Sequence, residues 1–186
     1  MDSPFMELYN EFACLSGLAI ARFEFSYMAE RRKTDGRRPP PRADKLIGEF
    51  ESAISRVRDE ANGKLAIGGK SMGGRVAAMV AGGERASTIE AVVCLGYPLH
   101  PPGKPDNLRL PPLLESKRPV LICQGKRDPL GTREEIDDLD LPEFVTAHWL
   151  EDGDHDFKPR KRAGVSWQEN VASAAEATAR FLNSLA

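Results

Sequence analysis

The amino-acid sequence predicts an α/β fold, a three-layer sandwich in which helices cover both faces of a mostly parallel sheet of about five strands. Two observations carry this prediction. Short apolar runs typical of buried strands alternate along the chain with amphipathic segments typical of helices. Between residues 65 and 79, an apolar run passes through a glycine-rich turn directly into a helix of small residues. With 186 residues, 41% of them hydrophobic, the chain is long enough for one domain over 1–186 with a complete core.

In the first third of the chain, the sequence predicts a helix, a strand, a loop, a second helix and a second strand, in that order. Apolar spacing favours a helix over residues 5–16, and the Ile- and Phe-rich run from Leu18 to Tyr27 favours a strand. Residues 30–44 are polar and basic around three consecutive prolines, which predicts a mobile loop. A helix to about Glu60 and a strand over 64–68 then lead into the glycine-rich turn.

The rest of the chain continues the alternation of strands and helices. We predict strands over residues 89–95, 120–124 and 144–150, and a helix from the glycine-rich turn to residues 82–83. Thr132 with Glu135, and Ser166 with Glu169, have the spacing of a capping box, which predicts a helix start at each position. The connection over 98–119 is rich in proline and predicts no long helix.

Charge and cysteine usage limit the partners. The 26 basic and 28 acidic residues give a net charge of -2, so the chain has no general attraction to nucleic acid or to a membrane. Three cysteines lie in apolar runs without a C-x-x-C pair, which favours buried thiols and neither disulfides nor a metal site. Neither a leader sequence nor a run of membrane-spanning length is found, so we expect a cytoplasmic protein. The chemistry inferred below from the serine motif needs no metal or cofactor.

The glycine-rich turn has the pattern G-x-S-x-G, which is typical of a nucleophile elbow. In such a turn a strand runs so abruptly into a helix that small neighbours are needed, and the serine oxygen is presented beyond the strand end. Ser71 is therefore the candidate nucleophile, and the N–H of Met72 is the candidate donor to an oxyanion. The other residues of the elbow are Gly69, Lys70, Gly73 and Gly74.

A serine nucleophile needs a histidine as general base, and the chain contains three. His148 lies inside a predicted strand, so its side chain should face one side of the sheet. His100 lies in the proline-rich connection and precedes every plausible acid in the later loops. His155 follows the last predicted strand at once, in a flexible loop, and is the candidate base.

The third member of a triad is a carboxylate that orients the histidine. Asp128 follows the predicted strand over 120–124, at the sheet edge where such an acid is expected. Asp152, Asp154 and Asp156 are rivals because they are close to the candidate base in sequence. We predict Asp128, because the rivals are not placed across the cleft from His155.

Four motifs in order resemble one family. They cover residues 68–75, 95–104, 124–131 and 152–160, and the strand from Arg22 to Tyr27 is similar as well. The family is the small, cap-less, dienelactone-hydrolase-like branch of the α/β-hydrolases, and within it the testis-expressed-protein and NSL-complex-subunit type. The resemblance implies a serine-hydrolase fold with Ser71, Asp128 and His155 at the triad positions. It says little about the substrate, since some members serve in complexes without demonstrated catalysis.

The beginning of the chain departs from the family pattern. Family members start with a strand whose following loop supplies a second oxyanion donor, and this sequence resembles the segment after that loop. In the family that strand lies between the run over 18–27 and the strand before the elbow. Without it, these two segments would either leave a gap in the sheet or have to pair with one another. The lost donor would cost roughly a hundredfold to a thousandfold in rate. Either Met1 is an internal methionine of a longer protein, which we favour, or the chain is a degenerate member.

The substrate is indicated only coarsely. The connection from Leu99 to Arg118 is too short for a helical lid domain, so we expect an open site for small or exposed acyl groups. Lys70, Arg75 and Arg127 flank the predicted site, and further basic residues follow the histidine. They would attract an anionic ester or thioester if they face the cleft, and would otherwise only solvate the surface.

These observations support a leading function and an alternative. The leading hypothesis is a serine hydrolase of the carboxylesterase or thioesterase type acting on a small-molecule ester or thioester. The alternative is a catalytically weak or inactive module that binds a protein partner. Nucleic-acid binding through residues 31–42 is disfavoured, because the stretch contains no aromatic residue on which bases would stack.

Overall fold

The computed structural model describes residues 3–34, 40–60 and 63–185. Their strands form one parallel sheet in the order β1-β2-β3-β4. The strands are β1 (Ala66–Lys70), β2 (Ala91–Leu95), β3 (Val120–Gly125) and β4 (Val145–Leu150). The described sheet therefore has one strand fewer than the five or so expected, and β1 lies at its edge.

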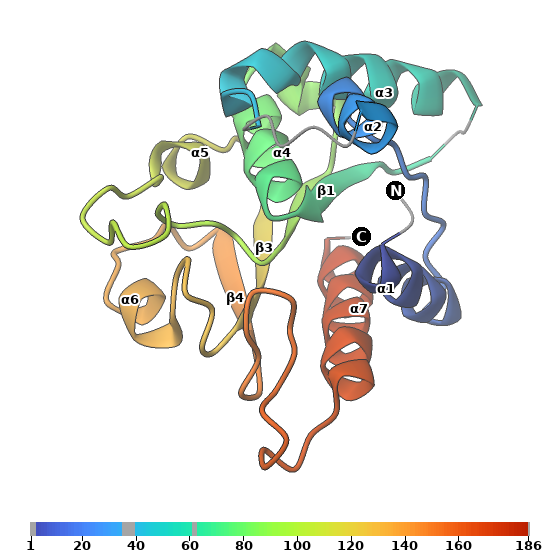
Figure 1. Cartoon of the computed structure of the whole chain (residues 1–186). Coiled ribbons are helices and arrows are strands. Elements are labelled where there is room, and N and C mark those ends of the chain that lie inside the picture. Colours follow the sequence, from blue (N-terminus) through green and yellow to red (C-terminus); the bar gives the residue numbers. More distant parts are fainter. Residues whose placement is uncertain (1–2, 35–39, 61–62, 186) are drawn as a thin grey trace.

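Helices connect the strands and flank the sheet (Figure 1). The α-helices are α1 (Pro4–Leu15), α2 (Ser26–Thr34), α3 (Ile47–Glu60), α4 (Met72–Gly82), α5 (Pro111–Leu114), α6 (Arg133–Asp137) and α7 (Trp167–Ser184). Two short 3-10 helices cover Ala43–Leu46 and Glu84–Thr88. Both predicted capping boxes are present, so α6 begins after Thr132 and α7 after Ser166.

The expected three layers are confirmed. Alternate side chains of a strand point to opposite faces of a sheet, and β2 divides its residues in this way. Val92 and Cys94 pack in the core with α3 and α4, whereas Val93 and Leu95 pack in the core with α1 and α7. Helix α1 also packs directly against α7 (Figure 1). All five residues of β2 are buried, as a strand covered on both faces must be.

The strand predicted from Leu18 to Tyr27 is wrong. Residues 18–25 have no regular structure, and α2 begins at Ser26. The aromatic residues that suggested a strand pack instead against α3, where the rings of Phe23 and Phe25 contact Phe50 with centroids 4.9 and 6.2 Å away. A strand needs a neighbour that completes its backbone hydrogen bonds. Within the described residues, no backbone hydrogen bond joins this segment to the edge strand β1.

Two smaller predictions also need correction. The loop predicted over 30–44 is partly helical, since α2 extends to Thr34 and a 3-10 helix begins at Ala43, while residues 35–39 lie outside the described part. The proline-rich connection contains only the four-residue helix α5, which agrees with the prediction of no long helix and no lid domain. Cys94 and Cys123 are buried free thiols as expected, but Cys14 is exposed.

Candidate active site

Ser71 lies at the sharp turn between β1 and α4. Its backbone has a φ of 54° and a ψ of -116°, a left-handed conformation that costs a serine roughly 1–3 kcal/mol. Hydrogen bonds hold the turn on both sides: the Ser71 N–H donates to the Leu95 carbonyl of β2 at 2.9 Å, and the Arg75 N–H donates to the Ser71 carbonyl at 3.2 Å. The serine side chain is thereby presented beyond the carboxyl end of β1, as the elbow pattern predicts.

The elbow glycines do not all serve the same purpose. A Cβ on Gly69 would lie 2.9 Å from the backbone of Gly73, so the strand and the helix can approach only without it. A Cβ on Gly74 would lie 2.8 Å from the Gly69 carbonyl oxygen and 3.0 Å from Cα of Cys94. A Cβ on Gly73 would meet nothing within 4 Å. The elbow pattern predicts that Gly69 and Gly73 both avoid a collision; this is confirmed at Gly69 and wrong at Gly73, and the second confined position is Gly74.

We expect Gly74→Ala to destabilise the protein by roughly 1–3 kcal/mol, because the new methyl group would meet two backbone segments that cannot move independently. Gly73→Ala is the matched control: it lies in open space inside α4, where alanine is favoured over glycine by up to about 1 kcal/mol. Urea denaturation measures both. Equal midpoints for the two variants would contradict this account of the elbow.

His155 connects Ser71 to Asp128 through two hydrogen bonds. Its Nε2 lies 2.9 Å from Ser71 Oγ, and its Nδ1 lies 2.7 Å from Asp128 Oδ2. Because an ionised carboxylate can only accept, Nδ1 carries the proton of the neutral ring, and the lone pair of Nε2 faces the serine hydroxyl. The three residues predicted from the sequence are thus brought together, from the ends of β1, β3 and β4.

Asp128 is completely buried, and its carboxylate is held by two further donors. The Leu130 N–H donates to Oδ1 at 2.9 Å, and Gln124 Nε2 donates to Oδ2 at 3.0 Å. These bonds fix the carboxylate in the orientation that receives the His155 ring. Together with His155 Nδ1, these donors supply the hydrogen bonds that a buried carboxylate requires.

Gln124 is the residue that the sequence interpretation missed. It is fully buried at the end of β3, where its Oε1 accepts from the Tyr97 N–H at 2.7 Å and its Nε2 also approaches the carbonyls of Tyr97 and Gly131. One amide thereby ties the acid loop after β3 to the loop after β2. The sequence feature that could have identified Gln124 is a polar side chain at the end of an otherwise apolar strand, because a buried polar group requires hydrogen-bond partners.

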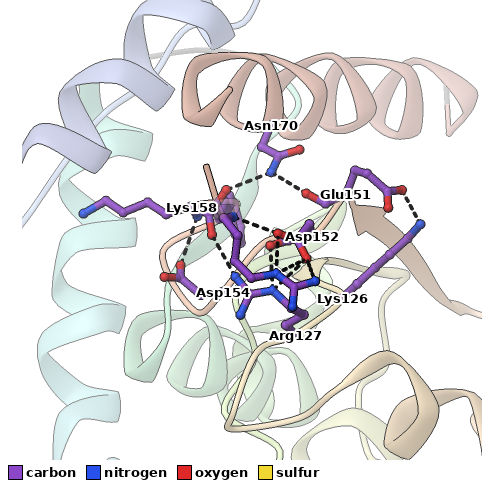
Figure 2. Close-up of polar contacts among 9 residues, drawn as sticks. Lys126, Arg127, Glu151, Asp152, Asp154, Lys158 and Asn170 are labelled. Atoms are coloured by element: carbon purple, nitrogen blue, oxygen red, sulfur yellow. Dashed lines mark hydrogen bonds and ion pairs between the residues drawn. The ribbon is translucent and has the colours of Figure 1, made fainter. Parts of the chain in front are cut away.

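The loop that carries His155 is held by an extensive polar network (Figure 2). Asp152 is its centre: its carboxylate accepts from the Arg160 side chain and the Arg160 N–H, and Arg127 Nε lies 3.0 Å from it. The bonds from Arg160 hold the pKa of Asp152 at about 2. Asp154 Oδ1 accepts from the N–H groups of Asp156 and Lys158 at 2.8 and 3.0 Å. These rival carboxylates therefore organise the loop, whereas Asp128 contacts the histidine.

Other contacts anchor the same loop to its surroundings. Asn170 of α7 donates to the carbonyls of Glu151 and Phe157 at 3.0 and 2.8 Å, and Lys126 forms an ion pair with Glu151 (Figure 2). Phe157 is fully buried although its φ is 66°. A strained residue that is completely packed indicates a loop with one well-defined conformation.

Lys70 joins the elbow to the histidine loop. Its Nζ lies 3.3 Å from Asp156 Oδ1 and 5.4 Å from the ring centroid of Phe5 in α1. Burial lowers the pKa of Lys70, and the nearby carboxylate of Asp156 opposes this shift. The lysine of the G-x-S-x-G motif is therefore paired with Asp156, the residue that follows His155.

The other two histidines lie elsewhere. His148 is in β4, as predicted, and its Nε2 lies 2.9 Å from Ser173 Oγ of α7. Burial lowers the pKa of His148. His100 is buried, with Nδ1 2.9 Å from the Pro101 carbonyl and Nε2 3.3 Å from Glu135 Oε1. Neither forms a hydrogen bond with Ser71 in the described structure.

The Met72 N–H is the first amide of α4, and in the described structure it donates to no carbonyl. The first amides of an α-helix lack partners within the helix and carry its positive dipole end. This free donor lies directly after Ser71, where charge would develop on a substrate oxygen.

The parallel sheet is covered on both faces, and a serine lies at a strained strand-to-helix turn. A histidine and an aspartate that are hydrogen-bonded to one another lie at the ends of other strands. These features together define an α/β-hydrolase-like protein. The chain belongs to the alpha/beta hydrolase domain family, whose model matches residues 1–183. This family and the related structures support a hydrolase.

Two solved structures illustrate the similarity. The esterase domain of a Rhodothermus marinus protein has a TM-score of 0.66 and 16% identity, over 97% of this chain and 79% of that chain. An alpha-beta serine hydrolase homologue from Coxiella burnetii has a TM-score of 0.65 and 15% identity, over 98% of this chain and 77% of that chain. At such identities the likeness shows the fold.

Two further features of the described residues concern a membrane and a metal ion. No helix among them is both long and apolar enough to cross a membrane. No cluster of three or more His, Cys, Asp or Glu side chains in the same residues is suited to hold a metal ion.

Proposed function

We propose that this protein is a serine hydrolase of the carboxylesterase or thioesterase type that acts as one domain over residues 1–186. The observation that carries the proposal is the continuous line of hydrogen bonds from Ser71 Oγ through His155 to the buried Asp128. The narrower relationship, to the dienelactone-hydrolase-like branch and its testis-expressed-protein and NSL-subunit type, and the cytoplasmic location remain predictions.

In the first half of the reaction, Ser71 attacks the carbonyl carbon of the ester or thioester. His155 Nε2 takes the hydroxyl proton as the Oγ–C bond forms, and the carbonyl electron pair moves to the oxygen. Asp128 stabilises the resulting imidazolium through Nδ1, and the Met72 N–H stabilises the oxyanion. When the tetrahedral intermediate collapses, the bond to the leaving alcohol or thiol breaks, and His155 supplies its proton.

In the second half, water hydrolyses the acyl-enzyme. His155 Nε2, now neutral, takes a proton from the water as its oxygen attacks the acyl carbon. The second tetrahedral intermediate collapses to a carboxylic acid, and the proton returns to Ser71. No metal or cofactor enters either step, and the short connection between β2 and β3 favours small or exposed acyl groups over long lipids.

Labelling with a fluorophosphonate probe tests this proposal directly. We expect an adduct on Ser71, identified by peptide mass spectrometry, because the probe requires a serine whose hydroxyl is activated by a base. Ser71→Ala removes the nucleophile and His155→Ala removes the base, so neither variant should be labelled.

A matched control uses the second Ser–His pair, His148 with Ser173. Ser173→Ala should be labelled as strongly as the unchanged protein, because no carboxylate among the described residues forms a hydrogen bond with His148. If the folded protein takes no label, the hydrolase proposal fails, and the alternative of a protein-binding module becomes the one to test.

A further inference from the structure

Arg75 and Arg109 are two interacting cations for which the described part of the chain supplies no anionic partner. Within residues 3–34, 40–60 and 63–185, no carboxylate forms an ion pair with either guanidinium. The Nε–H of Arg75 is buried and has no acceptor there, whereas Arg109 Nη1 donates only to the Pro98 carbonyl, at 3.4 Å. A buried donor without an acceptor is costly in a native structure and requires an explanation.

The two arginines repel one another. Burial, and then the neighbouring guanidinium of Arg75, lower the pKa of Arg109. Both remain charged at neutral pH because a guanidinium does not lose its proton in proteins. Arg75 also lies in the first turn of α4, which contains no acidic residue and where the helix dipole disfavours a cation. Three sources of positive potential thus converge, and an anion bound among them would relieve all three.

This arginine pair lies next to Ser71. Arg75 is one helical turn after the serine, so the two share a face of α4, and side chains on a helix lean toward its N-terminus. Arg109 is held on the loop after β2 by its backbone, which accepts from Tyr97 Oη at 2.7 Å and donates to the Leu99 carbonyl at 2.7 Å.

The same loop touches the histidine. A Cβ on Gly96 would lie 3.3 Å from the His155 ring. Pro98, the acceptor for Arg109, is two residues further, at most about 7 Å between Cα atoms. Arg109 is therefore anchored on the loop whose first residue touches His155, while Arg75 follows Ser71 on α4.

The neighbouring cations do not compete for this assignment. Lys70 is paired with Asp156, and Arg127 and Arg160 are paired with Asp152. Among the basic residues that flank the elbow and the acid loop, Arg75 is the one that the described structure leaves without a carboxylate. Its partner Arg109 was not singled out from the sequence, because it is distant from every motif of the triad.

We propose that Arg75 and Arg109 form a subsite for an oxyanion, a carboxylate or phosphate carried by the substrate at a fixed distance from its scissile ester or thioester. This inference rests on the proposed function, because it names the class of acyl substrate that Ser71 would attack. Two planar guanidinium groups provide several parallel N–H donors, a geometry that suits carboxylate and phosphate oxygens.

Calorimetric titration at low ionic strength tests the subsite without any turnover, using glutarate and inorganic phosphate as probes. We expect binding to the unchanged protein and an affinity lower by about tenfold to a hundredfold in Arg75→Gln and in Arg109→Gln, as is usual for a lost charge-assisted hydrogen bond. Arg56→Gln, at an exposed arginine of α3, is the matched control and should bind as tightly as the unchanged protein. The tighter of the two probes identifies the anion class.

A second arm compares kcat/KM for mono-4-nitrophenyl glutarate and for the neutral 4-nitrophenyl butyrate. We divide kcat/KM for the anionic ester by kcat/KM for the neutral ester. Arg75→Gln and Arg109→Gln should lower this ratio by at least about tenfold, and Arg56→Gln should leave it unchanged. Arginine-dependent binding without hydrolysis of either ester would support the subsite while the hydrolase function fails. Hydrolysis of both esters with no effect of the two arginines, or binding of neither anion, would overturn the subsite.

Discussion

Asp128→Asn is expected to lower kcat for an activated ester by about ten-thousandfold while the protein stays folded. The reason is the tautomer of His155. When the asparagine oxygen keeps the bond from the Leu130 N–H, its amide nitrogen takes the place of Oδ2, and the bond from Gln124 Nε2 is lost. The asparagine nitrogen donates, so His155 Nδ1 must accept, and the ring proton moves to Nε2, where the ring can no longer take the proton of Ser71. Steady-state kinetics with 4-nitrophenyl acetate measure the effect, and circular dichroism checks the fold.

Asp156→Asn is the matched control for this change. Asp156 is adjacent to His155 in sequence but contacts Lys70, and an asparagine can still accept from that ammonium. We therefore expect less than a tenfold loss of kcat. Equal losses in both variants would contradict the account in which Asp128, and not Asp156, sets the protonation of the His155 ring.

Positions at strand ends explain why the candidate triad could be predicted. Ser71, Asp128 and His155 each follow a strand of a parallel sheet, and the carboxyl ends of such strands share one edge. The elbow pattern and the apolar runs locate these ends from the sequence with errors of a few residues. β1, for example, covers Ala66–Lys70 and not residues 64–68. The alternation of strands and helices was predictable for a similar reason, because each pattern depends on residues that are neighbours in the sequence.

What the sequence did not reveal depends on contacts between distant segments. The run over 18–27 has the composition of a strand, but a strand exists only if another strand offers a free edge, and Phe23 and Phe25 pack on α3 instead. In the sequence, Gln124 only marks the end of an apolar strand. Its hydrogen bonds with Tyr97 and Asp128 form only once the fold has brought these segments together. The bonds of Asp152 to Arg160 likewise follow from a strained loop that composition does not show.

A large loss of stability is expected from Gly125→Ala. A Cβ on this last residue of β3 would lie closer than 3.0 Å to the carbonyl oxygens of Gly153 and Asp154, both backbone atoms of the histidine loop. Hydrogen bonds oppose a separation: the N–H groups of Lys126 and Arg127 donate to the carbonyls of Leu150 and Gly153 at 3.1 and 2.9 Å. Relief of the clash must therefore break these bonds or shift β3, so we expect a loss of about 3 kcal/mol or more in the free energy of unfolding.

Gly48→Ala provides the comparison, since a Cβ there meets nothing within 4 Å and lies in α3, where alanine should add up to about 1 kcal/mol. Urea denaturation and fluorophosphonate labelling of both variants distinguish two ways in which the clash can be relieved. If the whole sheet edge shifts, stability and labelling fall together. If only the histidine loop detaches, labelling of Ser71 is lost while most of the unfolding free energy remains, because His155 moves with the loop and the core between the sheet and α4 does not. A variant that is as stable and as reactive as Gly48→Ala would contradict the close contact between β3 and this loop.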